Sequence, residues 1–112
     1  MLDSIKQKLE KLNPIESTSL KKAGVFIGIL YHDDYILNPE VIFTQRSTKL
    51  STHSGEVSFP GGKWEEQDKN LYETALRESN EEINLNKEDV VLAGSLNYLV
   101  SKHKIEVNPY VG

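Results

Sequence analysis

The feature that most constrains the fold of this chain is an apolar run, AGVFIGILY, at residues 23–31. A continuous run of this length that is rich in Val, Ile and Phe favours a strand buried on both of its faces. It is far too short to span a bilayer as a helix, which takes about 20 residues. The run therefore predicts a buried strand.

The rest of the sequence alternates between helical and strand-like patterns. Residues 2–12 have apolar side chains at helical spacing, which predicts an amphipathic helix with Asp3 or Ser4 available as its cap and a stop at Asn13-Pro14. A second helix is predicted over Lys69–Ile83, with Asp68 as N-cap and Asn84 as a left-handed last residue. The other predicted features are a turn at 32–34, strands at 35–37, 41–44, 89–100 and 104–110, a loop at 46–57, and a break at Pro60-Gly61-Gly62.

Length and composition limit the classes of protein that fit. A chain of 112 residues is one domain at most, and 38% hydrophobic with 27% charged residues is typical of a soluble globular protein. The net charge of −4 gives no support to a general nucleic-acid or anionic-membrane binder. Cys is absent and no signal peptide is recognisable, so we expect neither disulfides nor thiolate chemistry, and a cytoplasmic location.

The segment RESNEEINL, residues 77–85, carries Glu78, Glu81 and Glu82 on one side of the predicted second helix. Like charges at offsets of three and four cost roughly 0.2–0.5 kcal/mol per pair. Arg77 can pair with Glu73 and Glu81, which leaves Glu78 and Glu82 facing each other without a cation. One interpretation is a solvated acidic face. The other is a divalent-ion site, because Mg²⁺ prefers carboxylate oxygens, waters and phosphate oxygens.

Two neighbouring features bear on that choice. The apolar stripe of the second helix is predicted to face the core and contains Tyr72, Leu76, Ser79 and Ile83. In FPGGKWEEQD, the adjacent Gly61 and Gly62 either form an ordinary turn or let a backbone carbonyl approach the carboxylates. With the acidic helix a few residues later, the second interpretation gains weight.

The segment Gly62–Leu85, GKWEEQDKNLYETALRESNEEINL, resembles the signature of the Nudix hydrolases. The segment just upstream, Ile42–Lys63, resembles the extended motif of their coenzyme A pyrophosphatase branch, which has the same longer box spacing and an Asp at the position of Asp68. Ser79 and Asn84 depart from the usual box, which has a small apolar residue and a Gly there. Neither departure removes an expected ligand.

The resemblance implies an α/β fold, a Nudix-type α/β/α sandwich with a mixed sheet, over a single domain 1–112. Because that fold usually continues, we expect the chain to be incomplete at the C-terminus, truncated after residue 112. The implied activity is hydrolysis of coenzyme A or its derivatives to 3′,5′-ADP and 4′-phosphopantetheine. Alternatives are another nucleoside diphosphate derivative such as ADP-ribose, or a non-catalytic nucleotide-binding domain.

The resemblance also assigns the catalytic set. Glu78 and Glu82 are expected to be the main ligands of Mg²⁺ or Mn²⁺, and Glu81 is expected to assist directly or through water. The carbonyl of Gly61 is expected to be a further ligand. Arg77 is expected to orient the carboxylates.

Substrate selection is expected to lie in the loop 46–57. Arg46 and Lys49 suit phosphate oxygens, and Lys63 is a further candidate; each is alternatively an ordinary surface base. His53 is a candidate for substrate binding or proton transfer, or it fixes the loop through a hydrogen bond. Glu56 is either a fourth metal carboxylate or a loop cap.

The sequence does not identify the general base. The acids downstream of the second helix are Glu88, Asp89 and Glu106, and none lies clearly on an expected catalytic loop. The expected partner is a small nucleotide substrate of the coenzyme A type, with no nucleic acid and no membrane. A homodimer remains an open alternative.

Overall fold

The computed structural model describes residues 2–12, 18–30, 39–45 and 55–112. Its elements, in chain order, are α1 Leu2–Glu10, β1 Lys22–Ile27, β2 Ile29–Leu30, β3 Glu40–Val41, β4 Thr44–Gln45, β5 Val57–Ser58, β6 Gly61–Lys63, α2 Leu71–Ile83, the short 3₁₀ helix η1 Lys87–Asp89, β7 Gly94–Ser95, β8 Leu99–Val100 and β9 Glu106–Val111. None of the helices in these ranges is long and apolar enough to cross a membrane.

The main sheet is mixed and has the strand order β6-β1-β9-β7, with β8 also paired to β9. Strands β1 and β9 run parallel, in register from Lys22 opposite Glu106 to Ile27 opposite Val111. Strand β6 joins β1 antiparallel, and β7 and β8 join β9 antiparallel. The predicted α/β class with a mixed sheet is therefore confirmed.

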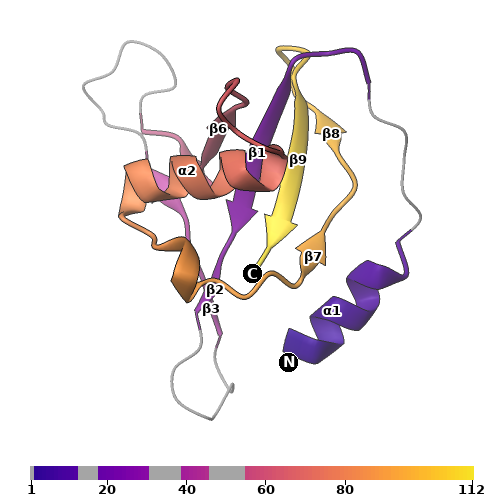
Figure 1. Cartoon of the computed structure of the whole chain (residues 1–112), viewed down its shortest axis with the longest axis vertical. Helices are drawn as coiled ribbons and strands as arrows, with labels where there is room; N and C mark the ends of the chain where they lie inside the picture. Colours follow the sequence, from indigo (N-terminus) through magenta and orange to yellow (C-terminus); the bar gives the residue numbers. More distant parts are fainter. Residues whose placement is uncertain (1, 13–17, 31–38, 46–54) are drawn as a thin grey trace.

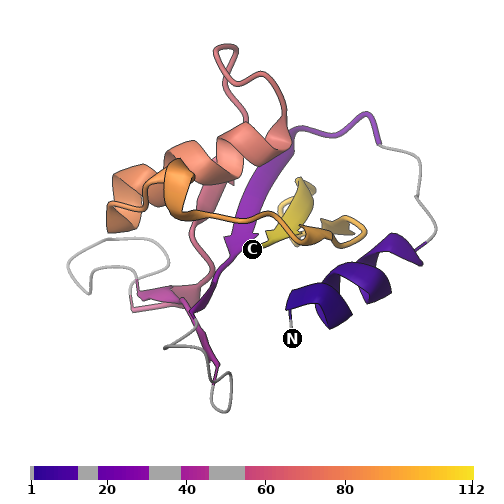
Figure 2. The ribbon, with the colours of Figure 1, turned by 60° about the horizontal axis from the view of Figure 1, so that its bottom comes forward.

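Helix α2 crosses one face of the sheet over β1 and β6 (Figure 1). The strand and the helix approach closely at Gly24, where a Cβ would lie 2.2 Å from the Leu71 carbonyl oxygen. Helix α1 lies beside β7 at the other edge of the sheet, as Figure 2 shows. The buried apolar side chains are Ala23, Phe26, Ala75, Leu76, Ala93 and Val111. Phe26, Ala75 and Leu76 form the core between α2 and the sheet, whereas Ala23 and Val111 belong to the other face of the sheet.

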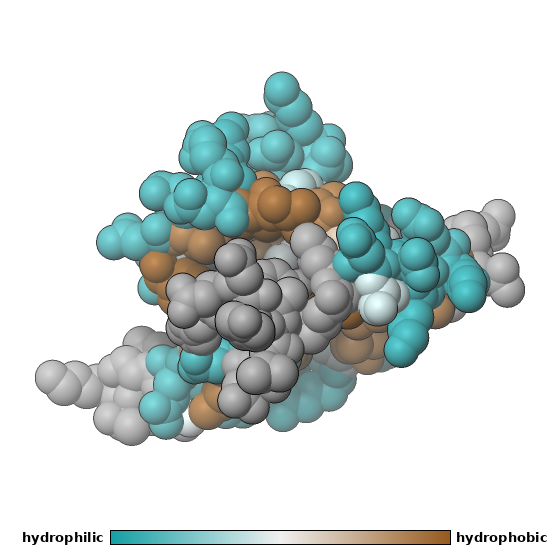
Figure 3. Space-filling model, turned by 90° about the horizontal axis from the view of Figure 1, so that it is seen from below, coloured by the Kyte–Doolittle hydropathy of each residue, from teal (hydrophilic) through white to brown (hydrophobic). Residues whose placement is uncertain are grey.

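The opposite face of the sheet carries apolar side chains that line a cavity among the described residues. Alternate residues of a strand point to opposite faces, so Val25 and Ile27 point away from α2 because Gly24 faces it. They border a cavity of about 470 Å³ whose other lining residues are Phe43, Val57, Ser58, Phe59, Leu96, Leu99, Val107 and Pro109. Figure 3 shows hydrophobic atoms reaching the surface between hydrophilic regions when the molecule is viewed from below. Apolar surface is therefore in contact with solvent in the described part of the chain.

Two predicted strands, at 23–31 and 41–44, are divided in the structure because their pairing partners change. The run at 23–31 contains β1, which pairs with β6 and β9, and β2, which pairs with β3. The segment 41–44 is likewise shared between β3 and β4. The segment 89–100 holds only β7 and β8 after η1, whereas the last predicted strand appears as β9.

Three other predictions can be compared with the structure. The first helix is confirmed, although it ends at Glu10. The expected break at Pro60-Gly61-Gly62 is wrong, because Gly61 and Gly62 belong to β6 and pair with β1 through backbone atoms alone. The turn at 32–34, the strand at 35–37 and residues 46–54 of the predicted loop lie outside the described residues, and Val57 belongs to β5.

Candidate functional site

Strand β6 is an edge strand, and its backbone presents two carbonyls at that edge. In an antiparallel pair, alternate residues bond to the same neighbour. The Pro60 carbonyl accepts a hydrogen bond from β1 at 2.8 Å, and the Trp64 N–H donates one to β1 at 3.0 Å. Gly62 is the β1-facing residue between them. The carbonyls of Gly61 and Lys63 therefore point away from β1, toward the open edge.

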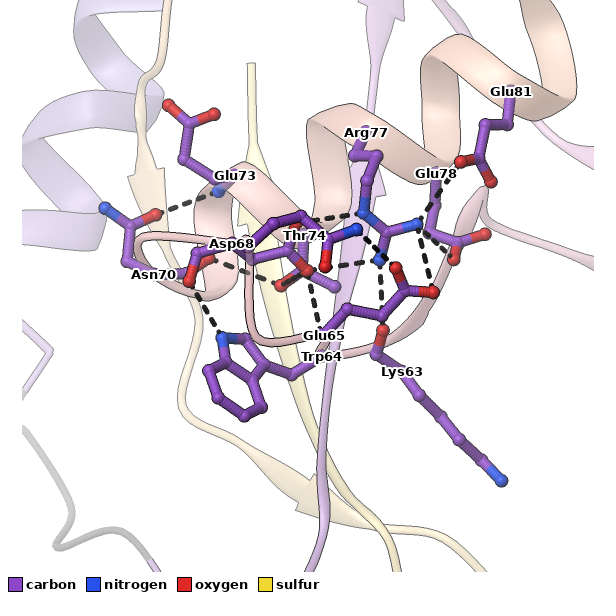
Figure 4. Close-up of polar contacts among 11 residues, drawn as sticks. Lys63, Trp64, Glu65, Asp68, Asn70, Glu73, Thr74, Arg77, Glu78 and Glu81 are labelled. Atoms are coloured by element: carbon purple, nitrogen blue, oxygen red, sulfur yellow. Dashed lines mark hydrogen bonds and ion pairs between the residues drawn. The ribbon is translucent and has the colours of Figure 1, made fainter.

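The turn between β6 and α2 is organised around the buried carboxylate of Asp68 (Figure 4). This carboxylate accepts hydrogen bonds from Glu65 N at 3.0 Å, from Thr74 Oγ1 at 2.9 Å, and from Nε and Nη2 of Arg77 at 2.9 and 3.1 Å. The Trp64 indole N–H donates to the Asp68 carbonyl at 3.1 Å. Chiefly through the Arg77 hydrogen bonds, the pKa of Asp68 is lowered to about 2, although burial opposes this shift.

The predicted role of Asp68 as helix cap is wrong. The N-cap is Asn70, whose side-chain oxygen accepts from Glu73 N at 2.8 Å, and α2 begins at the next residue. Asp68 is not free to cap the helix because Arg77 and Thr74 occupy its oxygens. The predicted end is confirmed, since Asn84 adopts the left-handed conformation with φ of 58°.

Arg77 links the turn, β6 and the acidic face of α2. Besides Asp68, its Nη2 donates to the Lys63 carbonyl at 3.2 Å, and its Nη1 donates to Glu78 Oε1 at 3.0 Å and Glu81 Oε1 at 3.4 Å. Hydrogen bonding to Asp68, more than any other cause, raises the pKa of Arg77 further above its usual value. The guanidinium is therefore a permanent cation at the centre of this site.

These contacts decide two sequence-based predictions. The pairing of Arg77 with Glu81 is confirmed. Glu78 was expected to lack a cation, but its carboxylate contacts Arg77, so that expectation is wrong. The Arg77 side chain extends toward Asp68. In this conformation its Nη1 lies beside Glu78 rather than beside Glu73.

The carboxylate of Glu78 lies directly against the backbone of Gly62. A Cβ on Gly62 would be 2.5 Å from Glu78 Cδ and 2.7 and 2.9 Å from its two oxygens. The carboxylate thus occupies space that only a glycine leaves open. The neighbouring Gly61 carbonyl points away from β1, and carboxylate and carbonyl oxygens are both donors that a hard divalent cation takes.

The other predicted metal ligands stay on the outer side of α2. Glu81 and Glu82 are exposed, and Glu82 lies one helical turn beyond Glu78. Within the described residues, no three His, Cys, Asp or Glu side chains are gathered closely enough to hold a metal ion. The donors present, carboxylate and carbonyl oxygens, are nevertheless those that a hard divalent cation takes.

The predicted core stripe of α2 is confirmed in part. Leu76 and Ser79 are buried, whereas Tyr72 and Ile83 are only half-buried. The hydroxyl of Ser79 donates to the Ala75 carbonyl at 2.7 Å, which satisfies it inside the core. Position 79 therefore accepts a polar residue without an unpaired donor.

The predicted substrate-binding residues are mostly outside the described part of the chain. Arg46, Lys49 and His53 fall in the range 46–54. Glu56 is exposed just before β5, and Lys63 is exposed at the end of β6. Of the described candidates, Lys63 is seen to contact Arg77, through its backbone carbonyl.

The three downstream acids differ in environment. Glu88 and Asp89 are exposed in η1, and neither is buried. Glu106 is 1% exposed and lies in β9, where it accepts hydrogen bonds from Thr18 N at 2.6 Å, Thr18 Oγ1 at 2.9 Å and Asn108 Nδ2 at 2.9 Å. Glu106 therefore acts in the described structure as an anchor for the segment before β1.

The sequence-based interpretation missed Thr74 and the true role of Asp68. Thr74 is fully buried and bonds to Asp68, yet it was not among the candidate residues. One signal was available, because Thr74 lies three residues before Arg77 and so on the same side of the helix. A polar side chain there, next to the predicted core stripe, requires a hydrogen-bond partner.

Comparisons with known proteins identify the family of this chain. The NUDIX domain family matches residues 31–110. Nudix hydrolase 15, mitochondrial, from Arabidopsis thaliana is 51% identical over 92 residues, which cover 82% of this chain and 32% of that protein. The chain thus spans about a third of the length of this relative.

Two solved structures resemble the fold at low identity. A MutT/nudix family protein from Enterococcus faecalis has a TM-score of 0.64 at 15% identity, covering all of this chain and 43% of that chain. The NUDIX domain of Shewanella oneidensis NrtR, complexed with ADP ribose, has a TM-score of 0.62 at 20% identity, covering 95% and 68%. With a family match that spans most of the chain and includes β6, α2 and their connecting turn, this protein belongs to the Nudix family.

Proposed function

We propose that the protein hydrolyses the diphosphate bond of a nucleoside diphosphate derivative with Mg²⁺ or Mn²⁺, and that coenzyme A or one of its derivatives is the substrate. The observation that carries this proposal is the placement of the Glu78 carboxylate between the Gly62 backbone and the Arg77 guanidinium. The family membership and the 51% identical Nudix hydrolase support the reaction class.

Under this proposal Glu78 and Glu82 hold the metal, with Glu81 and the Gly61 carbonyl as further donors. A bound divalent ion neutralises phosphate charge and lowers the pKa of a bound water. The protein supplies position: Arg77 holds Glu78 at 3.0 Å, and Asp68 holds Arg77 through two hydrogen bonds. Prearranged groups of this kind accelerate phosphoryl chemistry without covalent catalysis.

The choice of coenzyme A rests on the resemblance of Ile42–Lys63 to the extended motif of the coenzyme A pyrophosphatase branch. Two basic residues of that segment, Arg46 and Lys49, suit phosphate oxygens. A second candidate substrate is ADP-ribose, because the NUDIX domain of NrtR is described in complex with ADP ribose. A non-catalytic nucleotide-binding role is the third possibility, and the retention of Arg77, Glu78, Glu81 and Glu82 argues against it.

Product analysis separates these alternatives. The full-length protein is incubated with coenzyme A, with ADP-ribose and with a dinucleoside polyphosphate, each with Mg²⁺ or Mn²⁺. Mass spectrometry of the coenzyme A reaction is expected to show 3′,5′-ADP and 4′-phosphopantetheine at the highest turnover. Faster turnover of ADP-ribose would assign the second substrate, and no turnover of any of the three would reject the enzyme proposal.

A further inference from the structure

Thr74 carries a buried hydroxyl that the proposed reaction does not use directly. Its side chain is 0% exposed, and Oγ1 lies 2.9 Å from Asp68 Oδ2 and 3.3 Å from the Asn70 carbonyl oxygen. A hydroxyl has one proton to donate, and a hydrogen bond to a carboxylate is stronger than one to a neutral carbonyl. The shorter contact therefore fixes the hydroxyl on Asp68.

This contact determines how the Asp68 carboxylate is turned. Oδ2 accepts from Thr74, from Glu65 N at 3.0 Å and from Arg77 Nη2 at 3.1 Å, whereas Oδ1 accepts from Arg77 Nε at 2.9 Å. The carboxylate must lie in the plane of the guanidinium for both Arg77 bonds to form. Thr74 and Glu65 N both donate to Oδ2, and these two bonds hold the carboxylate in that plane.

We propose that Thr74 is a positioning residue of this site, acting through Asp68 and Arg77 on Glu78. Thr74 contacts Asp68, Asp68 fixes the guanidinium fork, and Nη1 of that fork holds Glu78 Oε1 at 3.0 Å. The effect of Thr74 on catalysis rests on the proposed function. The ordering of Arg77 and Glu78 by Thr74 does not depend on any substrate or metal.

The chain contains a matched control on the same helix. Ser79 is also 0% exposed and also carries a hydroxyl, but its Oγ donates to the Ala75 carbonyl at 2.7 Å. That bond stays within the helix and reaches neither Asp68 nor Arg77. The Ser79→Ala substitution therefore measures the effect of removing a buried hydroxyl from α2 that does not contact Asp68 or Arg77.

The first experiment measures solvent exchange of the Arg77 Nε–H by NMR, without metal or substrate. The variants are Thr74→Val, which keeps the volume and removes the hydroxyl, Thr74→Ser, which keeps the hydroxyl, and Ser79→Ala. Exchange is expected to accelerate several-fold in Thr74→Val and to stay within two-fold of wild type in the other two. Unchanged exchange in Thr74→Val overturns the proposal, and Thr74→Ala takes its place if Thr74→Val does not fold.

The second experiment measures the Mn²⁺ dissociation constant by electron paramagnetic resonance, alone and in a cycle with Asp68→Asn. Loss of one hydrogen bond of this kind is expected to weaken Mn²⁺ binding about five-fold in Thr74→Val. In the Asp68→Asn background, Thr74→Val is expected to weaken Mn²⁺ binding by less than a further two-fold, because the carboxylate that connects Thr74 to Arg77 has been removed. Fully additive effects would overturn the proposal.

The two experiments fail in distinguishable ways. If wild-type protein binds no Mn²⁺ and hydrolyses no nucleotide, the proposed function fails while the exchange measurement still decides whether Thr74 orders Arg77. If wild type is active but Thr74→Val exchanges normally, the proposed function stands and the role of Thr74 is rejected.

Discussion

The carboxylate of Glu78 occupies the space where a side chain at residue 62 would stand, with 2.5 Å separating Glu78 Cδ from a Cβ on Gly62. The Gly62→Ala substitution must therefore displace this carboxylate. Because the colliding atoms are the far end of a flexible side chain, the free energy of unfolding is expected to change by less than about 1 kcal/mol. Mn²⁺ binding, followed by calorimetry, is expected to weaken at least ten-fold.

Gly24→Ala is the matched control for this prediction. Its new Cβ would lie 2.2 Å from the Leu71 carbonyl oxygen, which is backbone and cannot rotate away. We expect this variant to be strongly destabilised, with a large fall in the midpoint of thermal unfolding. Wild-type Mn²⁺ affinity in a folded Gly62→Ala protein would contradict the assigned role of Glu78.

Asp68 makes the stability of the fold depend on pH in the acid range. The pKa of the Asp68 carboxyl falls from 3.8, its ordinary value in an unfolded chain, to about 2 in the folded protein. The chief cause is hydrogen bonding from Arg77. A depressed folded pKa stabilises the protein above pH 3.8, and this contribution is lost as the pH falls toward 2. Its size is about 2 kcal/mol. Urea unfolding at pH 5.5, 3 and 2 measures the loss.

The Asp68→Asn variant provides the comparison. It cannot ionise at residue 68, so the difference in unfolding free energy from wild type is expected to shrink between pH 5.5 and 2. A constant difference over that range would show that the Asp68–Arg77 ion pair does not stabilise the fold.

Glu82→Gln is expected to lower kcat by at least two orders of magnitude, because a neutral amide replaces a predicted metal ligand. Glu82 is exposed on α2, so the thermal midpoint is expected to move by no more than 2 °C. Steady-state kinetics on the substrate identified by product analysis, with Glu10→Gln on α1 as control, measures the effect. A wild-type rate in Glu82→Gln would reject its assignment as a ligand.

Glu106 is predicted to be a stabilising residue. Its buried carboxylate accepts hydrogen bonds from Thr18 and Asn108 and lies 3.9 Å from Lys22 Nζ. Removing it in Glu106→Ala leaves these donors without their acceptor, and a loss of about 3 kcal/mol in unfolding free energy is expected. Urea denaturation measures this loss, with Glu88→Ala in exposed η1 as control. Equal stability of the two variants would contradict the anchoring role.

The sequence predicted those features that depend on neighbours along the chain. Spacing within one helix was enough to place α2, its left-handed end at Asn84, the Arg77–Glu81 pair and the buried position of Ser79. These are contacts over three or four residues, which helical geometry alone determines. The resemblance of Gly62–Leu85 to the Nudix signature likewise needed only local order, and the NUDIX domain match agrees with it.

Tertiary structure decided the features that require segments far apart in sequence to meet. The Gly pair is a strand rather than a break because β1 satisfies its backbone, and β1 is placed in turn by parallel pairing with β9 at the other end of the chain. Asp68 does not cap α2 because Arg77 and Thr74, which lie later in the chain, donate hydrogen bonds to its carboxylate in the turn before the helix. Helical and strand periodicity show which side of an element is apolar. They do not show which neighbouring element will supply the hydrogen-bond partner of a polar group. The contacts of the site could therefore be known only from the tertiary structure.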